Sequence, residues 1–151
     1  MWTGGVRVVV IDENNRVLMM RQQHENRDIW MLPGGGIEDD ENAKQAAVRE
    51  VKEEAGLDIE VTSLLWHIEE VSCERGQRFV NFFLAKIKGG TLALGKDPER
   101  EDTKQVLKEA KFMSREEINA IEIVYPDCIR EELWQILAKA ETGHEVFKIR
   151  K

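Results

Sequence analysis

Three glutamates with close helical spacing are the first candidates for chemistry in this sequence. Glu50, Glu53 and Glu54 stand at positions i, i+3 and i+4, so a helix through them would bring the three carboxylates onto one face. Like charges at this spacing repel by roughly 0.2–0.5 kcal/mol per pair on an exposed helix. A hard divalent cation such as Mg2+ or Mn2+ would relieve that repulsion, because these ions prefer carboxylate oxygens, waters and substrate phosphates as ligands. The alternative is a solvated acidic face, salt-bridged to lysines such as Lys44 and Lys52.

The residues on either side of the glutamates predict how the chain presents them. A helix is expected over residues 42–55, because alanine and valine recur along one side of this stretch and would pack on a core. Gly56 is the expected end of that helix, since glycine accepts the left-handed conformation common there. Gly34, Gly35 and Gly36 allow either a turn folded closely around an ion or phosphate or a flexible loop. The candidates for the helix N-cap are Asp39, Asp40 and Asn42.

Chain length and charge limit the class of protein. With 151 residues, the chain is expected to form a single domain over residues 1–151 that buries roughly two-thirds of its unfolded surface. The net charge of −7 argues against a general nucleic-acid-binding protein, which would need a basic face for phosphates. An anionic substrate would need local positive charge or a metal ion to offset this acidic background.

The cysteines and the apolar segments indicate the cellular compartment in which the protein is expected. Cys73 and Cys128 lie far apart and outside any C-x-x-C pattern, so neither a zinc site nor a disulfide framework is expected. The N-terminus lacks a basic region followed by a sustained apolar run, and no stretch approaches the roughly 18–20 apolar residues of a membrane span. We therefore expect a cytoplasmic protein with no membrane partner, and the sequence leaves a homodimer open.

Apolar runs separated by turn residues predict a sheet that supports the glutamate helix. Residues 6–11 and 17–22 flank the polar cluster 12–16, which is a hairpin pattern. Pro33 ends a short strand, because proline cannot donate to a sheet ladder. The charged segment 95–105 is expected to be a loop. The predicted strands span residues 6–11, 17–22, 29–32, 59–70, 78–87 and 106–113.

Two further helices are predicted after the last strand. Ser114 and Glu117 have the S-x-x-E form of a capping box, which predicts a short helix ending near Ala120. Pro126 begins a longer amphipathic helix to about residue 140, which is expected to cover one face of the sheet. The final residues, 144–151, are interpreted as a tail or a late strand.

Taken together, the glycine, arginine and glutamate positions resemble the signature of the Nudix hydrolase family. The family's box is G-x5-E-x7-R-E-U-x-E-E-x-G-U, where U is a bulky apolar residue, and residues 35–57 fill each specified position. The preceding segment Trp30-x-Leu32-Pro33-Gly34-Gly35 is also similar to the family's lead-in. The matching positions are Gly35, Glu41, Arg49, Glu50, Val51, Glu53, Glu54, Gly56 and Leu57.

The resemblance implies a fold and a reaction. The fold would be of the α/β class, an α/β/α sandwich with a mixed, mostly antiparallel β-sheet. The reaction would be Mg2+-dependent hydrolysis of a diphosphate bond in a nucleoside diphosphate linked to another moiety, with Mn2+ as a second candidate ion. Such hydrolysis needs charge neutralised on the bridging and leaving oxygens and a water made nucleophilic, and a divalent ion can supply both. The expected partner is a small-molecule nucleotide or nucleoside diphosphate derivative.

The resemblance also implies the metal ligands. Glu50 and Glu54 are the expected carboxylate ligands, Glu53 is a further ligand or the general base, and the carbonyl of Gly35 is a backbone ligand. Bound metal favours ionised carboxylates, so these three glutamates cannot all act as bases of raised pKa.

Two other box residues are predicted to support the ligands. Arg49, counted among the catalytic residues, is expected to orient Glu50 through a charge-assisted hydrogen bond rather than to contact the substrate. Glu41 is expected to pin the glycine segment to the helix by an ion pair or a cap.

Residues outside the box are candidates for the base and for substrate binding. In this family the base often follows the box, and Glu101 ranks first here, ahead of Glu99 and Asp102; the alternative is that all three are solvated. Arg21 could reach a phosphate from the end of its strand, or it could be an exposed arginine beside the sheet.

The substrate is less constrained by the sequence. Ser72 stands where ADP-ribose-cleaving subfamilies tend to carry proline, and the only tyrosine is Tyr125, later than the diadenosine-polyphosphate subfamilies place theirs. The chain therefore resembles the nucleoside triphosphate pyrophosphatases of the nucleotide-sanitising type. The alternatives are a nucleotide-sugar or ADP-ribose pyrophosphatase and a non-catalytic nucleotide-sensing Nudix domain. Aromatic residues that either stack on a base or fill the core are Trp66, Phe79, Phe82 and Phe83.

Overall fold

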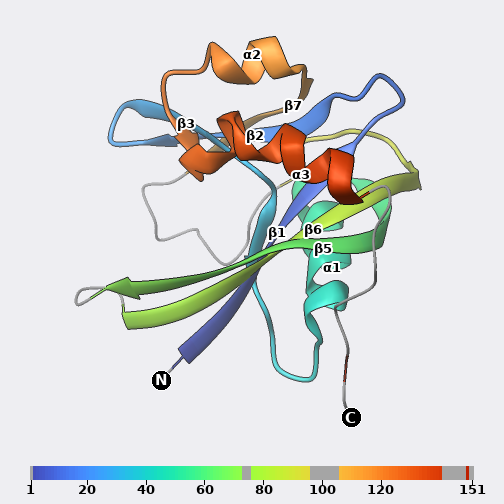
Figure 1. The fold of residues 1–151 in the computed structure, drawn as a ribbon, viewed down its shortest axis with the longest axis vertical. Helices are drawn as coiled ribbons and strands as arrows, with labels where there is room; N and C mark the ends of the chain where they lie inside the picture. Colours follow the sequence, from blue (N-terminus) through green and yellow to red (C-terminus); the bar gives the residue numbers. More distant parts are fainter. Residues whose placement is uncertain (1, 73–75, 96–105, 141–148, 150–151) are drawn as a thin grey trace.

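A strongly curled mixed sheet organises the chain (Figure 1). The computed structural model describes residues 2–72, 76–95, 106–140 and 149. The main path of the sheet runs β5-β6-β1-β2-β3-β8, while β4 pairs with β1 and β7 pairs with β2. The strands are β1 (Trp2–Ile11), β2 (Val17–His24), β3 (Arg27–Met31), β4 (Gly34–Gly36), β5 (Leu57–Ser72), β6 (Gly76–Gly90), β7 (Val106–Met113) and β8 (Val124–Tyr125).

The pairing of β1 explains the composition of that strand. It runs parallel to β6 from Trp2 opposite Gln77 to Ile11 opposite Lys86, and antiparallel to β2 and β4. Strands buried on both faces are nearly continuous apolar runs, which accounts for the valines of β1. The pair β3 and β8 is also parallel, whereas the other pairs are antiparallel. The expected mixed, mostly antiparallel sheet is confirmed.

The predicted hairpin between β1 and β2 is confirmed, and its turn is held by one side chain. Ile11 lies opposite Val17. Asp12 accepts hydrogen bonds at Oδ1 from the backbone N–H groups of Asn14 and Arg16, each at 2.9 Å. An aspartate that bonds its own downstream backbone stabilises a turn.

The glutamate helix forms where the sequence predicts it. Helix α1 (Ala43–Ala55) begins with a capping box in which Asn42 and Gln45 each accept from the other's backbone N–H. It ends at Gly56, whose φ of 72° is in the left-handed region. Of the N-cap candidates, Asn42 is therefore the cap.

The C-terminal helices differ from the prediction at one point. Helix α2 (Arg115–Asn119) has the predicted Ser114 and Glu117 capping box. Residues after Pro126 form a short 3-10 helix, η2 (Asp127–Arg130), followed by α3 (Glu132–Ala140). The prediction of one continuous helix is wrong, because the first turn is a 3-10 helix that ends at its C-cap, Glu131, before α3 begins.

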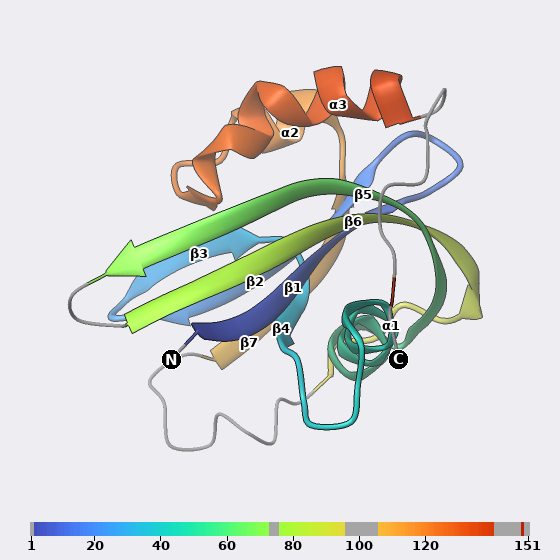
Figure 2. The same ribbon diagram turned by 60° about the horizontal axis from the view of Figure 1, so that its bottom comes forward.

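Helices cover both faces of the sheet, as Figure 2 shows, with α1 on one side and α2 and α3 on the other. Two apolar clusters fill the resulting layers. Val6, Val8 and Val10 point into the cluster beneath α1, while Val9 points into the cluster that includes Ile129 and Leu133. This alternation follows from the two-residue period of a strand. Among the described residues, no helix is both long and apolar enough to cross a membrane.

Candidate active site

The glycine segment lies directly against the glutamate helix. Gly34–Gly36 was expected to be a turn or loop, but it forms strand β4, with Gly35 opposite Val6 of β1. A Cβ atom on Gly35 would lie 2.4 Å from Oε1 of Glu50, and one on Gly34 would lie 2.0 Å from the carbonyl oxygen of Val6. The glycines are therefore needed for close approach, to a carboxylate on one side and to backbone on the other.

Arg49 connects the helix to this glycine segment. Its guanidinium donates to both carboxylate oxygens of Glu41 at 2.8 and 2.9 Å and to the carbonyl oxygen of Gly36 at 2.9 Å. It also donates to Oε1 of Glu50 at 3.0 Å and to Oε2 of Glu53 at 3.3 Å. The bond to Glu50 is the one predicted from the sequence, and only arginine has a planar fork that can serve so many acceptors.

The ion pair between Arg49 and Glu41 shifts both pKa values. Hydrogen bonding to Arg49 is the main cause that holds the pKa of the Glu41 carboxyl below its usual value, although burial acts in the opposite direction. The same bond is the main cause that raises the pKa of Arg49, with Glu50 adding to it. Glu41 also accepts the backbone N–H of Glu38 at 3.0 Å. Of the two alternatives for Glu41, the ion pair is therefore confirmed.

The three glutamates of the helix differ in their surroundings. Glu50 and Glu54 are buried, with 7% and 5% of their surface exposed, whereas the Glu53 side chain exposes 44%. Oε2 of Glu54 accepts the backbone N–H of Gly34 at 3.1 Å, so this carboxylate too is held against the glycine segment. As placed, no group of three His, Cys, Asp or Glu side chains among the described residues is close enough to hold a metal ion.

The type of donor at this site nevertheless fits a hard divalent cation. Glu50 and Glu54 bring two buried carboxylates to the same backbone segment, and burying carboxylates is costly unless positive charge or donors compensate. Glu53, one helical turn from Glu50, turns toward Arg49 and could be redirected by rotation of its side chain alone. The site therefore offers carboxylate and carbonyl oxygens, which are the ligands that Mg2+ and Mn2+ prefer.

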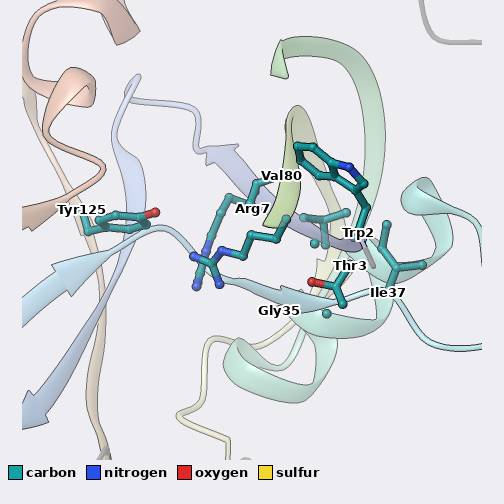
Figure 3. Close-up of a pocket in the computed structure, with 12 residues that line it drawn as sticks. Trp2, Thr3, Arg7, Gly35, Ile37, Val80 and Tyr125 are labelled. Atoms are coloured by element: carbon teal, nitrogen blue, oxygen red, sulfur yellow. The ribbon is translucent and has the colours of Figure 1, made fainter. Parts of the chain in front are cut away.

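A pocket of about 440 Å3 opens beside Gly35 (Figure 3). Strand β1 supplies much of its wall, and Arg78 of β6 and Tyr125 of β8 complete it. The close-up shows Tyr125 on one side of the Arg7 side chain, and Gly35, Thr3 and Ile37 on the other. The lining residues are Trp2, Thr3, Gly4, Gly5, Val6, Arg7, Gly35, Gly36, Ile37, Arg78, Val80 and Tyr125.

A carboxylate of β5 ties together two of the polar residues of this pocket. Glu70 lies opposite Arg78 in the sheet and accepts hydrogen bonds from Nε of Arg78 and from the hydroxyl of Tyr125. The bond from Arg78 is the main cause that lowers the pKa of Glu70, while burial is the main cause that raises the pKa of Tyr125. Arg7 contributes further positive charge near Glu70 and donates to the carbonyl oxygen of Leu32 at 2.9 Å.

Apart from Gly35 and Gly36, sequence reasoning missed the residues of this pocket. Trp2, Thr3, Arg78 and Tyr125 carry no signal of their own, because they come from strands that only the folded sheet brings together. Arg7 did carry a signal. It interrupts a run of valines in a strand that is buried on both faces, and a charge in such a position requires a local purpose.

The other predicted site residues lie elsewhere. Arg21 pairs with Glu109 at 3.2 Å and with Asp28 at 3.4 Å, and it is not among the described residues that line the pocket. Its substrate-binding role stays a prediction. Glu101, with Glu99 and Asp102, lies outside the described residues.

The aromatic candidates divide between core and sheet surface. Phe82 and Phe83 are buried, with 2% and 0% of their surface exposed, so they fill the core. Trp66 packs edge-on against Phe82, with ring centroids 5.7 Å apart. Phe79 stacks on His67 at 5.6 Å.

Comparison with known proteins gives a consistent picture. The family model of the NUDIX domain matches residues 1–138. The 8-oxo-dGDP phosphatase of Mus musculus is 42% identical over 98 residues, which are 64% of this chain and 29% of that protein. The ADP-ribose pyrophosphatase of Methanocaldococcus jannaschii is 32% identical over 95 residues, 62% of this chain and 56% of that protein. The matched region is thus less than two-thirds of either relative's length.

A solved structure agrees in fold. A NUDIX hydrolase from Nitrosomonas europaea superimposes with a TM-score of 0.71 at 18% sequence identity. The superposition covers 99% of this chain and 98% of the other. The two chains therefore share a fold.

Proposed function

Because the chain belongs to the Nudix hydrolase family, we propose that it is a metal-dependent hydrolase that cleaves a diphosphate bond in a nucleotide, of the type that removes oxidised nucleotides. The relatives named as 8-oxo-dGDP phosphatases favour this substrate class. Another relative is named as an ADP-ribose pyrophosphatase, so the alternative substrate is a nucleoside diphosphate linked to another moiety.

The observation that carries the proposal is the set of bonds around Arg49. One guanidinium holds Glu50 and Glu53 and, through Gly36, the backbone next to Gly35. The family resemblance implies that the carboxylates of Glu50 and Glu53 and the carbonyl of Gly35 are metal ligands. A site built for catalysis needs its ligands held by supporting residues, and Arg49 provides that support without facing the pocket itself.

The carboxylates and the glycine carbonyl would bind the ion together. Glu50, Glu54 and the carbonyl of Gly35 would bind Mg2+ or Mn2+, and Glu53 would be a further ligand or the general base. The ion would supply positive charge against the diphosphate oxygens and make an attacking water more acidic. Arg49 keeps Glu50 oriented throughout. Glu101 stays a prediction for the base.

The pocket beside Gly35 would receive the nucleoside. Its volume of about 440 Å3 is within the range of small-molecule sites. Because Gly35 lines this pocket, a nucleotide whose diphosphate lies at the glutamates can extend into it. A small-molecule substrate is the expected partner.

The proposal is tested by incubating the protein with Mg2+ and a panel of substrates. The panel contains 8-oxo-dGTP, 8-oxo-dGDP, the undamaged nucleotides, ADP-ribose and a nucleotide sugar, and the products are identified by chromatography. We expect hydrolysis of the oxidised nucleotides, with loss of activity in excess chelator. Manganese is tested as a replacement ion.

The matched variant is Glu54→Gln, which keeps the shape and one acceptor oxygen for the N–H of Gly34. We expect its activity to fall by orders of magnitude while the fold is retained, because the change removes charge from the metal site rather than packing. Full activity of Glu54→Gln, or full activity in chelator, would refute the metal-dependent mechanism. Binding of nucleotide without any product would instead favour the nucleotide-sensing alternative.

A further inference from the structure

A side-chain hydrogen bond closes the curled sheet between its two end strands. The path of the sheet begins at β5 and finishes at β8. Glu70 of β5 accepts the hydroxyl proton of Tyr125 of β8, and it also accepts a hydrogen bond from Nε of Arg78 of β6. Three strands therefore meet at one carboxylate, beside the pocket that Arg78 and Tyr125 line.

The backbone of Tyr125 is held by a short strand pairing, and its ring is held by Glu70. Strand β8 is two residues long and pairs with β3, with Met31 opposite Tyr125. Such a pairing fixes where the backbone lies but leaves the side chain a choice of rotamers. The bond to Glu70 selects the rotamer in which the hydroxyl turns toward the Arg7 side chain in the pocket (Figure 3).

The carboxylate of Glu70 is suited to hold both partners at once. An ionised carboxylate is an acceptor at both oxygens, and here Oε1 accepts from Tyr125 while Oε2 accepts from Arg78. Hydrogen bonds to an ionised group are roughly twice as strong as neutral ones. The bond from Arg78 is the main cause that lowers the pKa of Glu70, so the side chain is ionised at neutral pH.

We propose that Glu70 is a positioning residue for the substrate, because it holds Tyr125 and Arg78 in the wall of the pocket on which substrate binding depends. This inference rests on the proposed function, in which the pocket receives the part of the substrate beyond the diphosphate. The bonds of Glu70 go to β6 and β8, whereas the expected metal ligands lie on β4 and α1. Loss of Glu70 therefore weakens binding of the substrate and leaves the metal-dependent step intact.

The first test separates binding from chemistry in the variant Glu70→Gln. Glutamine keeps the shape of the side chain but has one acceptor oxygen in place of two, so it cannot accept from both partners. We expect the KM of the best substrate in the panel above to rise roughly tenfold, which corresponds to loss of one charge-assisted hydrogen bond. The kcat and the Mg2+ concentration for half-maximal activity should stay within about twofold of the wild type.

Three further variants assign the effect to the bond between Glu70 and Tyr125. Glu69→Gln is the matched control with an unchanged KM, because Glu69 is 62% exposed and lies 3.6 Å from Nε2 of His67. Tyr125→Phe should also raise KM, and its effect should not multiply with that of Glu70→Gln in the double variant, since both changes remove the same bond. Glu70→Asp keeps the charge on a shorter side chain and should recover part of the affinity.

The single tyrosine of the chain gives a second readout that needs no substrate. In protein made with 13C-labelled tyrosine, NMR observes Tyr125 alone. Burial is the main cause that raises the pKa of Tyr125, and Glu70 raises it further, while Arg78 lowers it. Glu70→Gln removes one of the raising causes, so the phenol should titrate at a lower pH than in the wild type. Glu69→Gln should leave this titration unchanged.

The two readouts distinguish failure of this inference from failure of the proposed function. If the protein hydrolyses no member of the panel, the hydrolase proposal fails, and the dissociation constant of 8-oxo-dGDP then replaces KM; absence of binding would overturn this inference as well. An unchanged affinity or an unchanged phenol titration in Glu70→Gln would overturn the positioning role and leave the hydrolase proposal standing. A fall in kcat at constant KM, together with a lower melting temperature, would also overturn it, because that pattern indicates a purely structural residue.

Discussion

Replacement of Glu41 by glutamine tests whether the Arg49 ion pair holds the site together. The Glu41 carboxylate accepts two guanidinium N–H groups at 2.8 and 2.9 Å, and both side chains are largely buried, with 14% and 20% exposed. Glutamine has nearly the same shape. The change therefore removes the charge and one acceptor without creating a cavity.

The size of the effect follows from these contacts. Hydrogen bonds to charged groups contribute about 1.5–3 kcal/mol each, and neutral ones about 1 kcal/mol. Glutamine can accept one bond from Arg49, but its amide NH2 would face the second guanidinium donor. We expect a loss of about 2 kcal/mol in the free energy of unfolding at neutral pH.

The pH dependence of this loss is a second, independent signature. The pKa of Glu41 is lowered in the folded protein from a reference of 4.5. A carboxyl with a lowered pKa stabilises the fold fully above its unfolded pKa, and the contribution disappears as the pH falls through the lower folded value. The stability difference between wild type and Glu41→Gln should therefore shrink on acidification below the reference pKa.

The assay is urea unfolding followed by tryptophan fluorescence at a series of pH values. The matched control is Glu38→Gln, because Glu38 lies 3.6 Å from the same guanidinium but is 49% exposed, and exposed pairs contribute at most about 1 kcal/mol. Equal stability of Glu41→Gln and wild type, or a difference that does not change with pH, would refute the role of this ion pair.

Three further predictions concern the helix and the glycine segment. Glu53→Gln should lower Mg2+-dependent turnover by orders of magnitude with an unchanged melting temperature, and an active variant would remove this carboxylate from the mechanism. Gly35→Ala should reduce activity in the same assay because the new Cβ displaces the Glu50 carboxylate. Gly89→Ala, whose Cβ would meet only Oδ2 of Asp58 at 3.8 Å and which does not line the pocket, should retain activity; equal activities would contradict the close approach. Asn42→Ala should cost about 1 kcal/mol of unfolding free energy in urea melts, because it removes the N-cap bond, and an unchanged midpoint would show that the cap is not needed.

The parts of the fold that depend on neighbouring residues could be predicted from the sequence. Helix α1 begins at the cap of Asn42 and ends at Gly56 because both signals act within one turn of the helix. The Ser114 capping box and the strand that precedes it, β7, also lie where expected. The bond from Arg49 to Glu50 joins adjacent residues, so a motif was enough to find it.

The parts that depend on distant residues could not be predicted in this way. Strand β4 forms because Gly5 and Gly36 can pair closely, which depends on the path of the sheet. Strand β8, with Tyr125, is two residues long and has no periodicity to detect. The curl of the sheet then brings Tyr125 to Glu70, fifty-five residues earlier in the chain. The pocket is thus a product of topology, not of any local pattern.

The parallel pairing of β1 with β6 has a consequence for synthesis of the protein. Residues 2–11 leave the ribosome well before their parallel partner strand, which ends only at Gly90. Until then β1 has its β2 hairpin neighbour but lacks β6, so a valine-rich edge stays open while most of the sheet is still being made. Unpaired apolar edges are sites of aggregation, and pairings so distant in sequence form slowly. The nascent chain is therefore most vulnerable between completion of β2 and emergence of β6.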